Sequence, residues 1–268
     1  KSLGIKKGDE VITAANTAIP TISAIRSTGA MPKLVDIDDN YLIDVSKIEA
    51  EITKKTKVII PVHLYGQVCN MDKIKKICKK NNLIIVEDCA QSQGAKYKNE
   101  FCGTIGKFGC FSFYPTKILG AYGDGGFILT NDYNLYKKAK RIRFYGIETT
   151  DKKNRFFNKY YSNEDGINSR LDEIQASILN FKLSMIEKLI KKRRQLAKLY
   201  FEQLKDTNIT LPKLNENSNH VYHLFTVYHP KREKIIKELK KSSIETKIIY
   251  PYPIHTMRPY KNLFKNKK

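Results

Sequence analysis

Short apolar runs that alternate with helical patterns are the feature that most limits how this chain can fold. Runs rich in Val, Ile and Leu are separated by stretches such as residues 71–80, where Ile74, Ile77 and Cys78 mark one apolar side. Strand, helix and strand in this order predict a parallel sheet covered by helices, an α/β fold. We expect strands at residues 10–13, 33–37, 57–63, 83–87, 109–113 and 127–130, and helices at residues 17–28, 46–52 and 71–80.

The second half of the chain has a different pattern. From Leu171 to about Leu204 apolar residues keep a helical period for longer than one globular helix usually runs, so we expect a break within it. A strand at residues 221–228, a helix at 231–240 and a strand at 245–250 are expected to follow. We therefore predict a large domain in residues 1–180, and a connecting helix with a small α+β domain in residues 181–268.

The formal net charge of +22 raises the question of nucleic-acid binding. The lysines recur on the polar faces of the expected helices, and the sequence has no zinc-finger spacing, RNA-binding aromatic signature or basic heptad region. Solvated helix faces and a small anionic substrate explain the charge equally well. We expect no nucleic-acid partner.

Cysteine usage and hydropathy indicate the compartment. The five cysteines are an odd number without a C-x-x-C pair, which is typical of reduced thiols and not of a disulfide framework or a metal site. No apolar run is long enough to span a bilayer, and residues 1–8 lack the hydrophobic core of a signal peptide. We expect a cytoplasmic protein with no metal and no membrane partner.

Three residue types near the expected strand ends suit one cofactor, pyridoxal 5′-phosphate. Asp88 follows the strand at 83–87, Ser112 lies near the end of the next one, and Lys117 comes shortly after it. This cofactor needs a lysine, a carboxylate beside its ring nitrogen and donors for its phosphate, and such groups gather at the carboxyl ends of parallel strands. Taken singly, Asp88 also fits a strand-end cap, Lys117 a solvated side chain, and the glycine-rich residues 120–126 a tight turn.

Two segments, EDCAQ at residues 87–91 and FSFYPTK at residues 111–117, resemble the sugar aminotransferases of the DegT/DnrJ/EryC1/StrS family, a fold-type I group. Similar matches occur in order at residues 8–12, 16–17, 61–67, 120–126 and 168–176. The resemblance implies the aspartate aminotransferase-like fold, with a mainly parallel sheet of the seven-stranded type and a small C-terminal domain. The chain departs from the family pattern at Ala18, where many members have an aromatic residue, and at both ends, where it is expected to be truncated.

The resemblance also implies roles for single residues. Lys117 would bear the cofactor as a Schiff base, and Asp88 would pair with the pyridinium nitrogen. Gln91 would contact the phenolic oxygen of the ring and Ser112 the phosphate. Asn168 is similar to an asparagine that reaches the phosphate of the neighbouring subunit, which implies a homodimer with shared active sites.

Tyr114, Arg170 and His255 are the candidate substrate residues. The Tyr114 form of the lysine segment is similar to that of 3-aminotransferases acting on dTDP-linked sugars, and His255 resembles a histidine near the substrate channel of the family. Arg170 has a structural alternative, an ion pair with Asp172 or Glu173.

The activity that the resemblance implies is transfer of an amino group from L-glutamate to a nucleotide-linked keto-deoxysugar, at C3 or C4, for amino sugars of surface polysaccharide such as O-antigen. Two alternatives remain open. A sugar dehydratase of the same fold would carry histidine in place of Lys117. A non-catalytic binding or regulatory protein would use the basic surface and bind no cofactor. The choice of sugar is expected to depend on loops such as residues 148–165.

Overall fold

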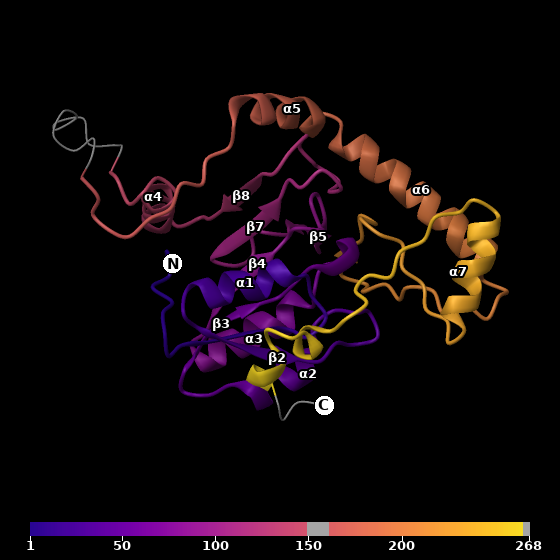
Figure 1. The fold of residues 1–268 in the computed structure, drawn as a ribbon, viewed down its shortest axis with the longest axis horizontal. Coiled ribbons are helices and arrows are strands. Elements are labelled where there is room, and N and C mark those ends of the chain that lie inside the picture. The colour runs from indigo at the N-terminus through magenta and orange to yellow at the C-terminus, as the bar shows by residue number, and fades with distance from the viewer. Residues whose placement is uncertain (149–160, 265–268) are drawn as a thin grey trace.

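A six-stranded sheet forms the centre of the molecule (Figure 1), a computed structural model that describes residues 1–148 and 161–264. Five neighbouring strands are parallel, and the sixth is antiparallel to the strand beside it. This confirms the predicted α/β fold with a mainly parallel sheet, although the described residues contain six strands of that sheet and not seven. In spatial order the strands are β2 (Met31–Val35), β1 (Glu10–Ala14), β3 (Thr56–Ile60), β4 (Ile84–Asp88), β7 (Phe108–Ser112) and β8 (Gly126–Leu129).

The helices of the first half begin and end close to their predicted bounds. In α3 the Asn70 side chain accepts a hydrogen bond from the backbone N–H of Lys73, and Asn82 ends the helix in the left-handed conformation. Ile74 and Ile77 are buried while most of its lysines are exposed, as the periodicity predicts. The helices are α1 (Ile19–Ser27), α2 (Val45–Ile48), α3 (Met71–Asn81), α4 (Tyr133–Ile142), α5 (Glu173–Leu183), α6 (Ile186–Leu204) and α7 (Arg232–Lys241).

Alternate residues of each strand face different layers of helix. Val11 and Val58 pack with Ile22 of α1 in one apolar cluster. Ile12 and Ile59, one position further along, pack in another cluster with residues of α2 and α3. The sheet is therefore buried on both faces at β1 and β3, and this explains why these strands read as nearly continuous apolar runs, whereas β8 at the edge is mostly exposed.

The expected break in the long helical segment is present. Helix α5 ends at Leu183 and α6 begins at Ile186, with Ser184 and Met185 between them. Leu179 of α5 packs near Phe113, which follows β7. Ser218 and Asn219 form the short strand β9, which pairs with β5 (Lys96–Tyr97); β5 also pairs with β6 (Glu100–Phe101). The proposed domain boundary at residues 180 and 181 stays a prediction.

The predicted strands at residues 221–228 and 245–250 are wrong. No partner strand runs along either segment within the described residues. Instead, the side chain of Arg193 donates to the carbonyl groups of Tyr222 and His223, at 3.0 and 3.1 Å. The Tyr65 hydroxyl binds the carbonyl of Ile249. Apolar alternation without a neighbouring strand thus gives irregular chain held by side chains and by separate backbone hydrogen bonds, such as those from Val221 to Gly66 and between Tyr228 and Thr210.

Among residues 1–148 and 161–264, no helix combines the length and the apolar character needed to cross a membrane.

Candidate active site

Two adjacent acids at the end of β4 point to opposite faces of the sheet, since successive side chains of a strand alternate. Asp88 faces the α1 side, where its Oδ2 atom accepts a hydrogen bond of 2.7 Å from the Thr21 hydroxyl of α1. The other carboxylate oxygen accepts from the backbone N–H of Ala90 at 3.1 Å. Glu87 lies on the other side and is fully buried. Each acid therefore has a different environment.

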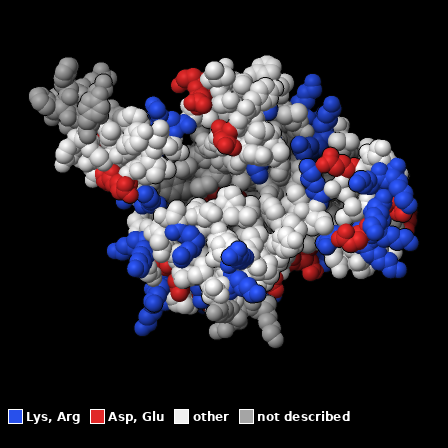
Figure 2. Space-filling view, viewed as in Figure 1, with Lys and Arg blue, Asp and Glu red and all other residues white. Residues whose placement is uncertain are grey.

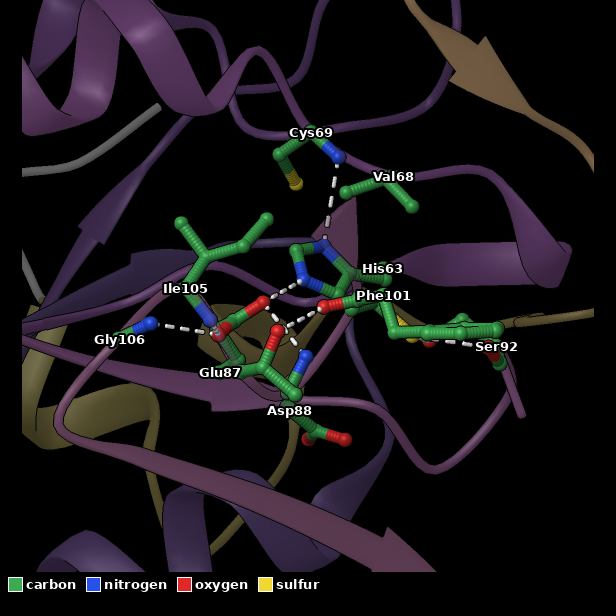
Figure 3. Close-up of polar contacts among 12 residues, drawn as sticks. His63, Val68, Cys69, Glu87, Asp88, Ser92, Phe101, Ile105 and Gly106 are labelled. Carbon is green, nitrogen blue, oxygen red and sulfur yellow. Dashed lines mark hydrogen bonds and ion pairs between the residues drawn. The ribbon is translucent and has the colours of Figure 1, made fainter. Parts of the chain in front are cut away.

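Glu87 forms a buried pair with His63, which follows β3 (Figure 3). The His63 Nε2 atom lies 3.0 Å from Glu87 Oε2, and the Cys69 backbone N–H donates to Nδ1 of the same ring at 3.3 Å. Backbone N–H groups of Gly103, Ile105 and Gly106 fill the remaining positions around the carboxylate, at 2.8, 2.8 and 2.6 Å. The pair therefore fixes the ends of β3 and β4 to the turn that precedes β7.

His63, Glu87 and Cys89 form a group whose ligand atoms lie within 4.8 Å of one another. Each oxygen of Glu87 already accepts two hydrogen bonds, which uses the lone pairs that a cation would need. Burial raises the pKa of the Cys89 thiol well above its usual value, so the metal-binding thiolate is disfavoured. We interpret the group as structural.

Lys117 lies in a tight loop just beyond β7. Its backbone N–H donates to the Tyr114 carbonyl at 2.9 Å, and a Cβ atom on Gly120 would come within 2.5 Å of the Pro115 carbonyl oxygen. Burial lowers the pKa of the Lys117 amine, and the charge of Asp88 acts in the opposite direction. The amine is thus in a partly dry environment that also feels the negative charge of Asp88. Asp88 pairs with Cys110 in parallel register, so β4 and β7 end at the same carboxyl edge of the sheet. Asp88 lies at this edge, and Lys117 lies in the loop that follows it.

Gln91 and Ser112 lie at the same edge. The Gln91 side chain accepts a hydrogen bond from the backbone N–H of Tyr65 and donates to the Tyr250 hydroxyl, both at 2.8 Å. Ser112 is the last residue of β7, and its hydroxyl accepts from the Tyr114 backbone at 3.2 Å. The structure thus brings four of the predicted cofactor residues, Asp88, Gln91, Ser112 and Lys117, to adjacent strand ends.

The other candidates are placed differently. Asn168 and Arg170 are exposed and hydrogen-bonded to each other at 3.1 Å, and the described residues show no hydrogen bond or ion pair from either to Asp88 or Lys117. The Arg170 guanidinium lies over the Phe144 ring, 5.6 Å from its centroid. Within the part of the chain that the structure describes, Arg170 has no ion pair with Asp172 or Glu173, so that alternative is wrong.

Tyr114 and His255 lie on segments beyond the sheet. Tyr114 is 52% exposed in the loop before Lys117. His255 is half-buried in a short 3-10 helix, Ile254–Thr256, whose first backbone N–H donates to the Ala15 carbonyl just after β1. Of the residues 148–165 expected to choose the sugar, positions 149–160 lie outside the described residues.

Sequence reasoning missed three residues beside the site: Thr21, Tyr250 and His223. Thr21 is a buried polar residue on the inner side of α1, and that position was a usable signal. Burial and the charges of Lys117 and Arg193 lower the pKa of the buried His223 ring to about 3, so that the ring is neutral. Nothing local in the sequence indicates Tyr250 or His223, because both reach the site from distant segments.

A family model covers the whole chain, residues 1–268, and its description is "DegT/DnrJ/EryC1/StrS aminotransferase family". The chain belongs to this family. Family members depend on pyridoxal phosphate, so the chain is an aminotransferase with that cofactor.

Named relatives of this DegT/DnrJ/EryC1/StrS aminotransferase support the assignment. The dTDP-3-amino-3,4,6-trideoxy-alpha-D-glucose transaminase of Micromonospora megalomicea subsp. nigra is 41% identical over 98% of this chain and 70% of its own length. The dTDP-3-amino-3,6-dideoxy-alpha-D-galactopyranose transaminase of Aneurinibacillus thermoaerophilus is 45% identical over 97% of this chain and 69% of its own. The crystal structure of S. venezuelae DesV in complex with a ketimine intermediate matches with a TM-score of 0.91 and 36% identity, over 97% of this chain and 68% of that chain.

Proposed function

We propose that this aminotransferase moves an amino group from L-glutamate to the C3 keto group of a dTDP-linked deoxysugar, with Lys117 as the lysine that carries the cofactor. The observation that supports it most is the pairing of β4 with β7, because it sets Asp88 beside the strand whose carboxyl end leads into the loop that carries Lys117. An acid and an amine so placed match the two ends of the pyridoxal ring that need them.

The residues present fit pyridoxal phosphate. Thr21 and the Ala90 backbone occupy one lone pair on each oxygen of Asp88, which leaves the carboxylate able to accept from the ring nitrogen. The Ser112 hydroxyl can donate to the phosphate. On the face seen in Figure 2, the surface is hollowed between α1 and β8, over β7.

Asp88 and Lys117 have different roles in the proposed reaction. Pyridoxal phosphate, when bound, withdraws electrons from the substrate carbon that loses its proton. Asp88 keeps the ring nitrogen protonated by placing a negative charge beside it. Lys117, whose pKa burial lowers, can hold and return the proton of that carbon more readily than a fully solvated lysine.

The substrate assignment is supported by the names of two relatives, both transaminases of dTDP-3-amino sugars. A net charge of +22 also suits a substrate that carries a diphosphate. L-Glutamate is the donor that the family resemblance implies. We place the reaction in amino-sugar biosynthesis in the cytoplasm, where the five free cysteines of the chain stay reduced.

The active unit in this proposal is a homodimer, in which Asn168 reaches the phosphate of the partner subunit. Asn168 is exposed, as that role requires. Ile174 and Phe181 of α5 are 74% and 69% exposed, and Phe127 and Ile128 of β8 are also exposed. Large apolar side chains gathered on neighbouring elements are typical of a surface that another subunit covers.

Reduction with borohydride tests the central assignment. The protein loaded with pyridoxal phosphate should show a visible absorption band that reduction abolishes, and peptide mass spectrometry should find the label on Lys117. The Lys117→Ala variant should take no label and should not turn over, and Lys107→Ala, which removes an exposed lysine near the start of β7, serves as the control. A label on another lysine would exclude the assignment.

The substrate is tested separately. Mass spectrometry of the products formed from a panel of keto-sugar nucleotides would identify it.

A further inference from the structure

The Gln91 side chain is held by two partners from opposite ends of the sequence. Its Oε1 atom accepts from the backbone N–H of Tyr65, and its Nε2 atom donates to the phenol of Tyr250. A backbone N–H can only donate, so the Tyr65 contact fixes which end of the amide is the oxygen. The NH₂ end is thereby directed toward Tyr250.

Tyr250 accepts one of the two hydrogens on Gln91 Nε2 and so fixes the direction of the other. Without this acceptor the amide would be restrained at its oxygen alone and could rotate about the terminal torsion, which has broad preferences. Gln91 is buried, and the Tyr250 contact is its only side-chain hydrogen bond from Nε2 in the described part of the chain. The second hydrogen is available to a ligand.

The phenol of Tyr250 lies close to the charged centre of the site. Burial raises its pKa, the hydrogen bond from Gln91 lowers it, and the charge of Asp88 raises it, with a net value above normal. The hydroxyl therefore stays protonated and neutral at working pH. It can accept from Gln91 without adding a second negative charge beside Asp88.

The segment that carries Tyr250 is itself anchored to the carboxyl edge of the sheet. The Tyr65 hydroxyl binds the carbonyl of Ile249, the residue before it. Five residues after Ile249, the backbone N–H of Ile254 donates to the carbonyl of Ala15, beyond β1. The position of Tyr250 is therefore set by contacts on both sides, and these do not involve Gln91.

We propose that Tyr250 is a positioning residue of the active site, which aims the amide of Gln91 at the phenolic oxygen of the bound cofactor. This inference rests on the proposed function, in which Gln91 meets that oxygen. With the cofactor bound, this donor would stabilise negative charge on the ring oxygen, and the nitrogen supplied by Lys117 would then hold its proton less tightly.

The Tyr250→Phe substitution tests this by removing one oxygen atom. In the protein loaded with pyridoxal phosphate, the pH midpoint of the visible absorption change should move upward by roughly 0.4 to 1 pH unit, the equivalent of one typical hydrogen bond. Tyr252→Phe makes the same change at a side chain that is 66% exposed, and its midpoint should equal that of the unsubstituted protein.

Gln91→Ala separates a positioning role from a purely structural one. It should raise the midpoint at least as much as Tyr250→Phe, and adding Tyr250→Phe to it should produce no further shift. The inference would be overturned if Tyr250→Phe left the pH midpoint unchanged. It would also be overturned if Tyr250→Phe shifted the midpoint as much in the Gln91→Ala variant as in the unsubstituted protein. Absence of any absorption band in the unsubstituted protein would instead count against the proposed function.

Discussion

Asp88 owes its predicted role to its charge more than to its shape. Asp88→Asn keeps the size of the side chain and an oxygen that can accept from Thr21, but it removes the negative charge beside the ring nitrogen. We expect turnover to fall by roughly 100-fold to 1,000-fold, with a much smaller change in the dissociation constant of the cofactor. Steady-state kinetics and a spectroscopic cofactor titration measure the two effects. Asp124→Asn, at an exposed position after Lys117, is the control, and equal turnover in Asp88→Asn would contradict the role.

Glu87, the neighbour of Asp88, is expected to contribute to stability. Glu87→Gln removes the charge that His63 and three backbone N–H groups contact, and puts an NH₂ group against donors. We expect a loss of about 3 to 5 kcal/mol in the free energy of unfolding, as for other broken buried pairs. Urea unfolding measures it. Glu100→Gln, which changes an exposed ion pair with Lys75, should have little effect, and equal losses in the two variants would contradict the interpretation.

The contribution of Glu87 should depend on pH with a definite sign. Burial alone would raise the pKa of its carboxyl, but the contact with His63 and the N–H groups of Gly103 and Gly106 lower it below the usual 4.5. A carboxyl whose pKa is lower in the folded state stabilises fully above its unfolded pKa, and the effect is lost as the pH falls through the folded pKa. The difference in stability between the parent protein and Glu87→Gln should therefore narrow below pH 4.5. A difference that widens in acid would contradict this sign.

At the scale of elements, the close approach of the 103–106 turn to β7 depends on glycine. A Cβ atom on Gly109 would lie 2.3 Å from backbone atoms of Gly103, whereas one on Gly126 of β8 would meet nothing nearer than the Phe111 carbonyl at 3.2 Å. Gly109→Ala should destabilise the protein by about 2 to 3 kcal/mol, with Gly126→Ala clearly milder. Thermal unfolding of both variants measures the difference. Equal midpoints would show that the turn can move away from the strand.

The elements that sequence predicts well are those defined by local periodicity. Apolar runs and helical spacing locate β4, β7 and α3, and strand order in the chain then places Asp88 and Lys117 at one edge. The expected strands at 221–228 and 245–250 fail because pairing depends on a neighbour that no local pattern reveals. The same reason hides Tyr250, which is 159 residues from Gln91 in the chain.

For the whole molecule, the homodimer proposal predicts that two inactive variants restore activity when mixed. In this proposal each site takes Lys117 from one subunit and Asn168 from the other. A dimer of one Lys117→Ala subunit and one Asn168→Ala subunit therefore has one site with both residues and one site with neither. Unfolding and refolding an equal mixture should recover about a quarter of the parental activity, since half of the dimers are mixed. Each variant refolded alone sets the baseline. A mixture no more active than that baseline would contradict shared sites.

The two consecutive acids of β4 also stabilise one register of that strand against its neighbours. Displacing the strand by one position relative to its neighbours would turn each side chain to the opposite face. Glu87 would then leave the imidazole and amide groups that neutralise it, and Asp88 would enter a dry interior in its place. An uncompensated interior charge is costly enough to reject the misaligned sheet. Asp88, which serves the active site, and Glu87, which favours the correct strand register, thus occupy neighbouring positions in the chain.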